Sequence, residues 1–181
     1  MKNLFSRFIA LLLLIGALPL LILVGIVVLF IEQDKILFLQ TRLGINKKTF
    51  IIYKLRTMKN NQITFLGRAL RKTGIDEIPQ LINIIKGDLN FIGPRPLTQF
   101  DIERLNWTSY FYSKRWNVKP GLTGLAQLSP ICHKKMTLFW DQYYVNHKNI
   151  VLDIKIICAS FLTLVIGKKR VKAVIQKKLN K

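Results

Sequence analysis

Two adjacent carboxylates, Asp76 and Glu77, are the residues of this chain best suited to chemistry on a phosphoryl group. Pro79 fits a helix only in its first turn, so we predict a helix that begins near Asp76 and uses Asp76 as its N-cap. A helix N-terminus attracts anions, and its field should keep Asp76 ionised, as a carboxylate nucleophile must be. A simpler interpretation stays open, in which Asp76 only caps a surface helix.

The rest of this predicted helix is amphipathic and ends at a glycine. Gly87 directly follows Lys86 and marks the C-terminus. Apolar residues recur at helical spacing and should face a core, at Ile78, Leu81, Ile82 and Ile85. The carboxylate pair is therefore expected at one end of a packed helix.

Cationic residues lie on both sides of the carboxylates in the sequence. Lys54 and Arg56 are two positions apart in an extended segment and should share one face, and Arg71 lies just upstream of the pair. Pro96 confines the backbone of Arg95 to extended conformations, and a guanidinium fixed in this way suits bidentate phosphate binding. An ordinary proline-rich corner with a solvated arginine is the alternative.

The elements around these residues follow from their apolar runs and turn residues. Residues 36–58 are predicted to form two short strands joined by a turn around Gly44 and Asn46. The aromatic-rich stretch 100–116 suits either a membrane interface or a small core. The loop at 118–128, rich in glycine and proline, could approach a ligand closely.

The composition predicts an anionic partner. Among 181 residues there are 29 Lys and Arg against 9 Asp and Glu, which gives a net charge of +20. Lipid head groups, nucleic acid and phosphorylated substrates all fit this excess. Cys132 and Cys158 lack metal-type spacing and are interpreted as free thiols, and His133 and His147 stand outside any ligand cluster.

An uncharged apolar segment, residues 8–31, is long enough to cross a bilayer. Pro19 lies at its centre and is expected to bend it. Lys2 and Arg7 precede the segment and all other basic residues follow it, so the positive-inside rule favours the cytoplasm for both ends. A re-entrant hairpin satisfies this preference, and a kinked helix that spans the bilayer is the alternative.

The C-terminal part is also suited to a membrane surface. The apolar run at 156–166 is too short to span a bilayer and fits an embedded or packed helix. The tail at 168–181 alternates basic and apolar residues, a pattern typical of a helix on anionic lipid, although a tail that binds nucleic acid would also be basic.

Taken in order, the motifs of this chain resemble one family. They are ILFLQTRLG, YKLRTM, LGRALRKTGIDEIPQLINIIKGDLNFIGPRPL, VKPGLTGLAQL and DQYYVNHKNIVLDIKI, from about residue 18 to residue 157. The chain resembles the bacterial sugar transferases that start glycan assembly, and more narrowly the small monotopic phosphoglycosyl transferases that act on polyprenol phosphate. The most specific signal is DEIPQL followed closely by GPRP.

The resemblance implies a two-step reaction at the cytoplasmic face of the bacterial inner membrane. Asp76 would attack the β-phosphate of a UDP-sugar, and polyprenol (undecaprenyl) phosphate would then take the sugar phosphate from Asp76. It implies that Glu77 helps to hold Mg²⁺, and that phosphate groups are bound by Arg95, Arg71, Arg56 and Lys54. The sequence departs from the family at Leu18, where a serine is common, and at Ile131, where an arginine is expected.

The expected fold is mainly α with a small β element. It would be a monotopic membrane protein with a Pro19-kinked re-entrant helix at 1–33, a catalytic domain at 34–157 and a membrane-associated basic segment at 158–181. A non-catalytic, membrane-anchored basic scaffold is the competing hypothesis, but it gives no purpose to the Asp76–Glu77 pair. A nucleic-acid binder is disfavoured because the chain shows no recognised binding motif. The oligomeric state and the sugar are not encoded in any pattern found here.

Overall fold

The computed structural model describes residues 2–33, 35–107, 110–129 and 134–166. The chain forms two compact units, the first made of Met1–Thr41 and Ile51–Asp88 and the second of Arg42–Phe50 and Leu89–Lys181. Helices predominate, and the described strands pair in two-stranded sheets. The prediction of a mainly α fold with a small β element is therefore confirmed.

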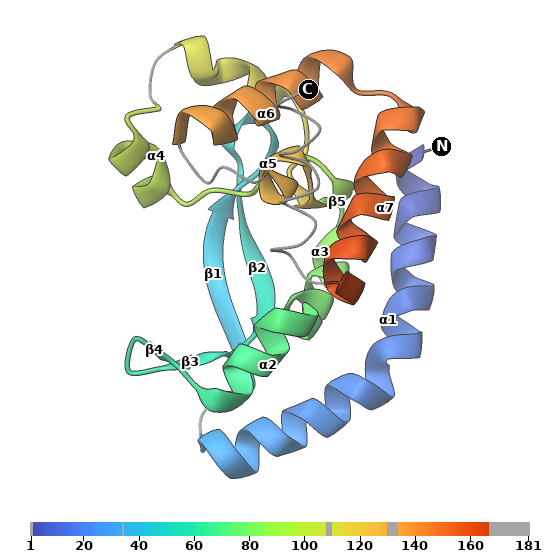
Figure 1. Cartoon of the computed structure of the whole chain (residues 1–181), viewed down its shortest axis with the longest axis vertical. Helices are drawn as coiled ribbons and strands as arrows, with labels where there is room; N and C mark the ends of the chain where they lie inside the picture. The colour runs from blue at the N-terminus through green and yellow to red at the C-terminus, as the bar shows by residue number, and fades with distance from the viewer. Residues whose placement is uncertain (1, 34, 108–109, 130–133, 167–181) are drawn as a thin grey trace. The chain divides into compact units, whose positions relative to one another are not determined.

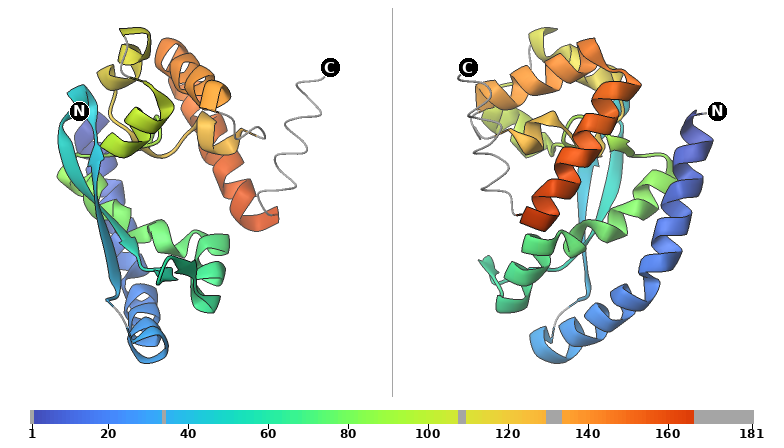
Figure 2. Two further views of the ribbon diagram at one scale, coloured as in Figure 1. Left: turned by 90° about the vertical axis from the view of Figure 1, so that its left-hand side faces the viewer. Right: turned by 45° about the vertical axis from the view of Figure 1, so that its right-hand side comes forward.

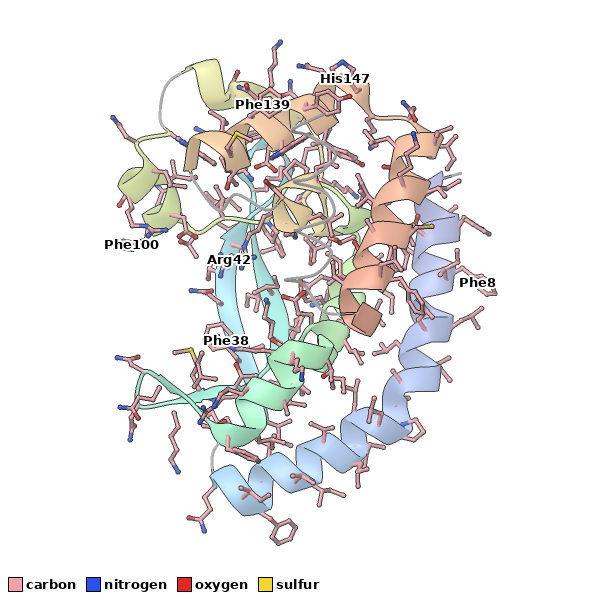
Figure 3. All side chains as sticks on the ribbon, in the orientation of Figure 1. Phe8, Phe38, Arg42, Phe100, Phe139 and His147 are labelled. Carbon is pink, nitrogen blue, oxygen red and sulfur yellow. The ribbon has the colours of Figure 1, made fainter. Side chains whose placement is uncertain are left out.

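Unit 1 begins with a long apolar helix. Helix α1 (Lys2–Val27) runs through Pro19 and continues as the π-helical η1 (Val28–Glu32), and its axis curves along its length (Figure 1). The stretch Leu4–Ile31 is long and apolar enough to cross a membrane. Most of its large side chains are exposed, as the outward-pointing Phe8 illustrates (Figure 3).

Two hairpins follow the apolar helix. Strands β1 (Leu37–Leu43) and β2 (Thr49–Leu55) pair around the short η2 (Ile45–Lys47), as the sequence predicts for residues 36–58. Strands β3 (Met58–Lys59) and β4 (Gln62–Ile63) form a second, very short hairpin. Its two turn residues, Asn60 and Asn61, have φ values of 49° and 61°, and positive φ at both positions is the signature of a tight hairpin turn.

The carboxylates lie in a 3₁₀ helix, which corrects the predicted helix start. Helix α2 (Phe65–Thr73) ends at Gly74, and η3 (Ile75–Gln80) begins at once and leads into α3 (Leu81–Lys86). Asp76 is thus the second residue of η3, and the N-cap position belongs to Gly74, whose φ of 73° favours glycine. The predicted stop is confirmed, since Gly87 caps α3 with a φ of 88°.

Helix α3 forms the centre of unit 1 and packs against α1 (Figure 1). Of the four residues predicted to face the core, Leu81 is buried, whereas Ile78, Ile82 and Ile85 are only partly covered. Ile84, which was not predicted to face the core, is 1% exposed. The predicted face is wrong at this point because the change from 3₁₀ to α geometry shifts the register. The buried apolar residues of this unit are Ala10, Val28, Ile52, Leu55, Leu70, Leu81 and Ile84.

Unit 2 contains a short pair of parallel strands, β5 (Asn90–Ile92) and β6 (Gly121–Thr123). Its helices are α4 (Gln99–Leu105), the 3₁₀ helix η4 (Tyr110–Asn117), α5 (Leu125–Leu128), α6 (Lys134–His147) and α7 (Ile150–Ile166). Helices α6 and α7 meet at a sharp corner, and α5 packs against both (Figure 2). Trp107 and Trp116 lie in a core cluster, so the core interpretation of these two aromatic residues holds.

The glycines of unit 2 bring two backbone segments together. A Cβ atom at Gly121 would collide with the backbone of Gly93, and one at Gly124 would collide with the Gly93 carbonyl. The close approach predicted for the loop at 118–128 is therefore made to the chain itself. Cys158 is a free, exposed cysteine. Ile131, Cys132, His133 and the tail at 168–181 lie outside the described residues, and the division at 33/34 and 157/158 stays a prediction.

Candidate active site

Asp76 lies in unit 1 and is buried, since the residue is only 8% exposed. The 3₁₀ geometry of η3 places it there, because Gly74 turns the chain sharply at the end of α2 and its carbonyl accepts from the N–H of Glu77. Consecutive side chains of a 3₁₀ helix point about 120° apart. Asp76 and Glu77 can therefore serve different partners.

Lys54 and Arg71 supply positive charge around the pair. The Lys54 Nζ atom lies 2.7 Å from Glu77 Oε1, and Lys54 comes from the end of β2. Arg71 donates through Nε to the Thr57 hydroxyl at 2.8 Å, which leaves its terminal nitrogens to donate elsewhere. Both cations act on the Asp76 carboxylate electrostatically.

A glycine makes the position of Arg71 possible. A Cβ atom at Gly67 would collide with the backbone carbonyl of Thr57, so α2 can approach Thr57 only with glycine there. Arg71 lies one helical turn after Gly67 and therefore reaches the same residue. The spacing of LGRALRK thus fixes one guanidinium close to the carboxylate pair.

The pKa of Asp76 is raised, which corrects the expectation that a helix terminus would lower it. Burial is the largest cause, and the neighbouring Glu77 carboxylate adds to it. Lys54, Arg71 and a backbone hydrogen bond act in the opposite direction but do not outweigh the burial. The site holds a basic carboxylate that any additional cation would help to ionise.

Asn83 fastens this arrangement to the strand that carries Lys54. Its side chain is fully buried and donates through Nδ2 to the carbonyl of Ile51 at 2.6 Å, and its Oδ1 accepts from the N–H of Tyr53 at 3.2 Å. Through Asn83, α3 therefore makes hydrogen bonds to the backbone of β2 that a neighbouring strand would otherwise make. These two hydrogen bonds fix the distance between β2 and the helical segment that contains Asp76.

Two further residues, Arg56 and Arg95, were predicted to bind phosphate. Arg56 follows β2, is partly buried, and donates its backbone N–H to Ile36. Leu55 between Lys54 and Arg56 is buried, as alternation along an extended segment requires. Arg95 belongs to unit 2, where its side chain is exposed.

The turn at Pro94–Pro96 is fixed by two other arginines of unit 2. Arg115 Nη2 donates to the carbonyl of Arg95 at 2.7 Å. Arg42, labelled in Figure 3, donates to the carbonyl of Pro96 at 3.1 Å and pairs with Asp101 at 3.3 Å. Backbone contacts on both sides hold the turn, so the Arg95 guanidinium starts from a preorganised backbone.

Arg115 forms a buried ion pair that the sequence did not suggest. Its Nη2 lies 3.1 Å from Asp141 Oδ2, both side chains are 2% exposed, and its guanidinium packs on the rings of Trp107 and Trp116. Burial raises the pKa of Asp141 to about 6, while the charges of Arg115 and Arg95 oppose that rise. The only signal in the sequence is the place of Asp141 at the start of the DQYYV motif.

A divalent cation fits the Asp76–Glu77 pair. Mg²⁺ is commonly bound through one or two carboxylates together with substrate phosphates. The like charge of Glu77 raises the pKa of Asp76, so a dication beside both would relieve an existing repulsion. Within the described residues, no cluster of three or more His, Cys, Asp and Glu offers an all-protein metal site.

A family model described as bacterial sugar transferase matches residues 1–167, a range that contains every site residue above. The chain belongs to the bacterial sugar transferase family. This transferase is 38% identical over 139 residues to the uncharacterized sugar transferase EpsL of Bacillus subtilis, an alignment that covers 68% of the present chain and 66% of EpsL.

Two further relatives carry names that state a reaction. The transferase is 29% identical over 168 residues to a UDP-N-acetylgalactosamine-undecaprenyl-phosphate N-acetylgalactosaminephosphotransferase of Aeromonas hydrophila, covering 82% of this chain and 40% of the relative. It is 31% identical over 170 residues to a UDP-glucose:undecaprenyl-phosphate glucose-1-phosphate transferase of Escherichia coli, covering 82% and 36%. The chain thus spans about two fifths of the length of these two relatives.

Proposed function

We propose that this transferase moves a sugar phosphate from a UDP-sugar to undecaprenyl phosphate through a covalent intermediate on Asp76. The observation that supports it is the buried Asp76 carboxylate with Glu77 beside it and with Lys54 and Arg71 acting on its charge. Both relatives named for a reaction are UDP-sugar:undecaprenyl-phosphate sugar phosphotransferases, and they differ in the sugar. The proposal therefore specifies a UDP-sugar but no particular sugar.

In the first step, an Asp76 carboxylate oxygen attacks the β-phosphorus of the donor. The bond between that phosphorus and the bridging oxygen breaks, and UMP leaves with the electron pair. The raised pKa of Asp76 favours this role, because a more basic carboxylate is a stronger nucleophile once it is ionised. Lys54 and Arg71 hold the charge of the ionised form and of the phosphoryl oxygens.

In the second step, a phosphate oxygen of undecaprenyl phosphate attacks the same phosphorus. The Asp76–phosphorus bond breaks, the carboxylate is regenerated, and undecaprenyl-diphosphate sugar is released. Asp76 and Glu77 would hold Mg²⁺, which neutralises charge on transferring phosphoryl groups when it is bound. Lys54 pairs with Glu77 at 2.7 Å and keeps that carboxylate in place. Arg56 and Arg95 are proposed as additional phosphate ligands.

We further propose that α1 enters the membrane and returns to the same face. Arg7 lies before the uncharged segment, and its Nη2 is 3.5 Å from the carbonyl of Lys86 at the end of α3. At the other end, Gly25 faces the Ile36 side chain. A simple span would carry Arg7 to the opposite side from α3, so these contacts within unit 1 support a re-entrant helix and a catalytic unit on the cytoplasmic face.

The activity is tested with purified protein, undecaprenyl phosphate, Mg²⁺ and a panel of UDP-sugars. UMP release should occur with at least one donor and should be lost in Asp76→Asn. Glu103→Gln is the matched control, because Glu103 is an exposed carboxylate on α4. Unchanged release in Asp76→Asn would reject the nucleophile. For topology, cysteines introduced at positions 3 and 60 should label from the same side of the membrane, and labelling from opposite sides would reject the re-entrant helix.

A further inference from the structure

Thr57 is a buried polar residue that lies just after β2, and it contacts α2 through both its backbone and its side chain. Its carbonyl accepts from the N–H of Thr64 at 3.2 Å, and the backbone of Gly67 lies against the same carbonyl. Its hydroxyl accepts from Arg71 Nε at 2.8 Å. Thr57 therefore contacts α2 from the N-cap at Thr64 to the last turn, which contains Arg71.

Arg71 itself is exposed, in contrast to Thr57. An exposed arginine side chain samples many rotamers, so a ligand that binds it must first order it at a cost in conformational entropy. The hydrogen bond from Nε to the Thr57 hydroxyl restricts that freedom, and water competes poorly for an acceptor on a residue only 6% exposed. The guanidinium of Arg71 is thus held at its Nε atom before any ligand arrives.

The position of this hydrogen bond determines which edge of the guanidinium can bind a phosphate. An arginine carries its N–H donors in a rigid, planar fork, and two neighbouring nitrogens of that fork can bind two phosphate oxygens together. One such edge contains Nε, which already donates to Thr57. The edge formed by Nη1 and Nη2 is therefore the one left for a bidentate phosphate contact.

We propose that Thr57 is a positioning residue, whose hydroxyl holds Nε of Arg71 so that the Nη1–Nη2 edge meets the diphosphate of the nucleotide donor. This inference rests on the proposed function, in which Arg71 is a phosphate ligand. The charge of Arg71 acts on the Asp76 carboxylate, so the guanidinium lies close enough to serve the same reaction. Gly67 contributes indirectly, because only glycine lets α2 approach Thr57 closely enough for this hydrogen bond.

The test measures the affinity of the full chain for UDP, which carries the diphosphate of the donor and requires no turnover. Wild type, Thr57→Val, Arg71→Ala and the variant with both changes form a double-mutant cycle. Valine has nearly the shape of threonine but lacks the hydroxyl. A calorimetric titration reports the Kd of the folded protein, so partial unfolding of a variant lowers the stoichiometry and leaves the Kd unchanged.

Two further variants serve as rescue and control. Thr57→Ser keeps a hydroxyl at the same position and should retain the hydrogen bond to Arg71. Thr73→Val removes a hydroxyl from the same helix, and it is the matched control because Thr73 is exposed and donates only to the carbonyls of Ala69 and Leu70 in its own helix.

We expect Thr57→Val to weaken UDP binding by about 3- to 10-fold, which is the effect of ordering one long side chain on binding. Thr57→Ser and Thr73→Val should stay within about twofold of wild type. When Arg71 is already alanine, Thr57→Val should change the Kd by less than about twofold, because Thr57 then has no guanidinium to hold.

An unchanged Kd in Thr57→Val would overturn the inference and leave the proposed function standing. An equal loss with Arg71 present and absent would also overturn it, since Thr57 would then support only the local structure. If Arg71→Ala binds UDP as tightly as wild type, the phosphate role of Arg71 fails and the inference with it. The nucleophile is tested separately by UMP release in Asp76→Asn, so the failure of the inference and the failure of the proposed reaction are distinguishable.

Discussion

Replacing Asn83 by alanine should destabilise unit 1 more than any other single polar truncation in it. The change removes the acceptor for the N–H of Tyr53 and the donor for the carbonyl of Ile51, both at a fully buried position. A buried backbone group left without a partner costs about 1–3 kcal/mol, so two such groups cost about 2–6 kcal/mol. In a chain of this size that corresponds to a fall in melting temperature of roughly 5–20 °C.

Asn83→Asp tests the hydrogen-bond argument more sharply than alanine does. The aspartate can still accept from Tyr53, but only its protonated form can donate to Ile51. Burial raises the pKa of such a carboxyl above its unfolded value, so its favourable contribution is present at low pH and is lost as the pH rises through the folded pKa. Asn83→Asp should therefore approach the wild-type stability on acidification, whereas Asn83→Ala should not.

The assay combines circular dichroism melting with hydrogen exchange of the β2 segment around Tyr53. Exchange at that segment should accelerate in Asn83→Ala, because the amide loses its acceptor. Asn146→Ala is the control, since Asn146 is exposed on α6. A melting temperature within 2 °C of wild type, which is roughly 1 kcal/mol or less, with unchanged exchange at β2 would refute the view that Asn83 holds α3 to the strand.

Two further predictions concern a close approach and a buried ion pair. Gly67→Ala should lower the free energy of unfolding by roughly 1–3 kcal/mol, because the added Cβ meets the Thr57 carbonyl. Gly16→Ala, with nothing near the added atom, should be neutral or stabilising. Equal melting temperatures for the two variants would contradict this. Burial raises the pKa of Asp141 from 3.8 to about 6, against the opposing charge of Arg115. The stability that the protonated carboxyl contributes is therefore fully present below pH 3.8 and is lost as the pH rises from there through 6. The loss of stability over this pH range is at most about 3 kcal/mol. Asp141→Asn should abolish this dependence of the melting temperature on pH. An unchanged pH dependence would show that another group causes it.

Part of the fold could be predicted from the chemistry of turn and capping residues. The hairpin at 36–58 and the stop at Gly87 follow from turn and capping residues, and the structure has both. The start of the carboxylate helix could not be placed, because Gly74 supports a 3₁₀ helix that directly continues α2. A sequence pattern does not distinguish that arrangement from a new helix capped by Asp76.

The supporting polar residues were the part that sequence reasoning missed. Asn83 interrupts an apolar run and gives no sign that it replaces a strand partner. Arg115 and Asp141 are 26 positions apart, as their numbers show, and form a pair only after folding. The raised pKa of Asp76 likewise depends on burial by distant segments, which outweighs the local helix field. Contacts of this kind require the tertiary structure.

The central claim is a covalent bond between Asp76 and the donor phosphorus. The most direct measurement is mass spectrometry of the protein mixed with a UDP-sugar and Mg²⁺, without acceptor, quenched rapidly and digested. We expect the peptide that contains Asp76 to carry the mass of one sugar phosphate, to lose it on addition of undecaprenyl phosphate, and to remain unmodified in Asp76→Asn. Release of UMP in the presence of acceptor, with no adduct on that peptide at any time point, would contradict the account.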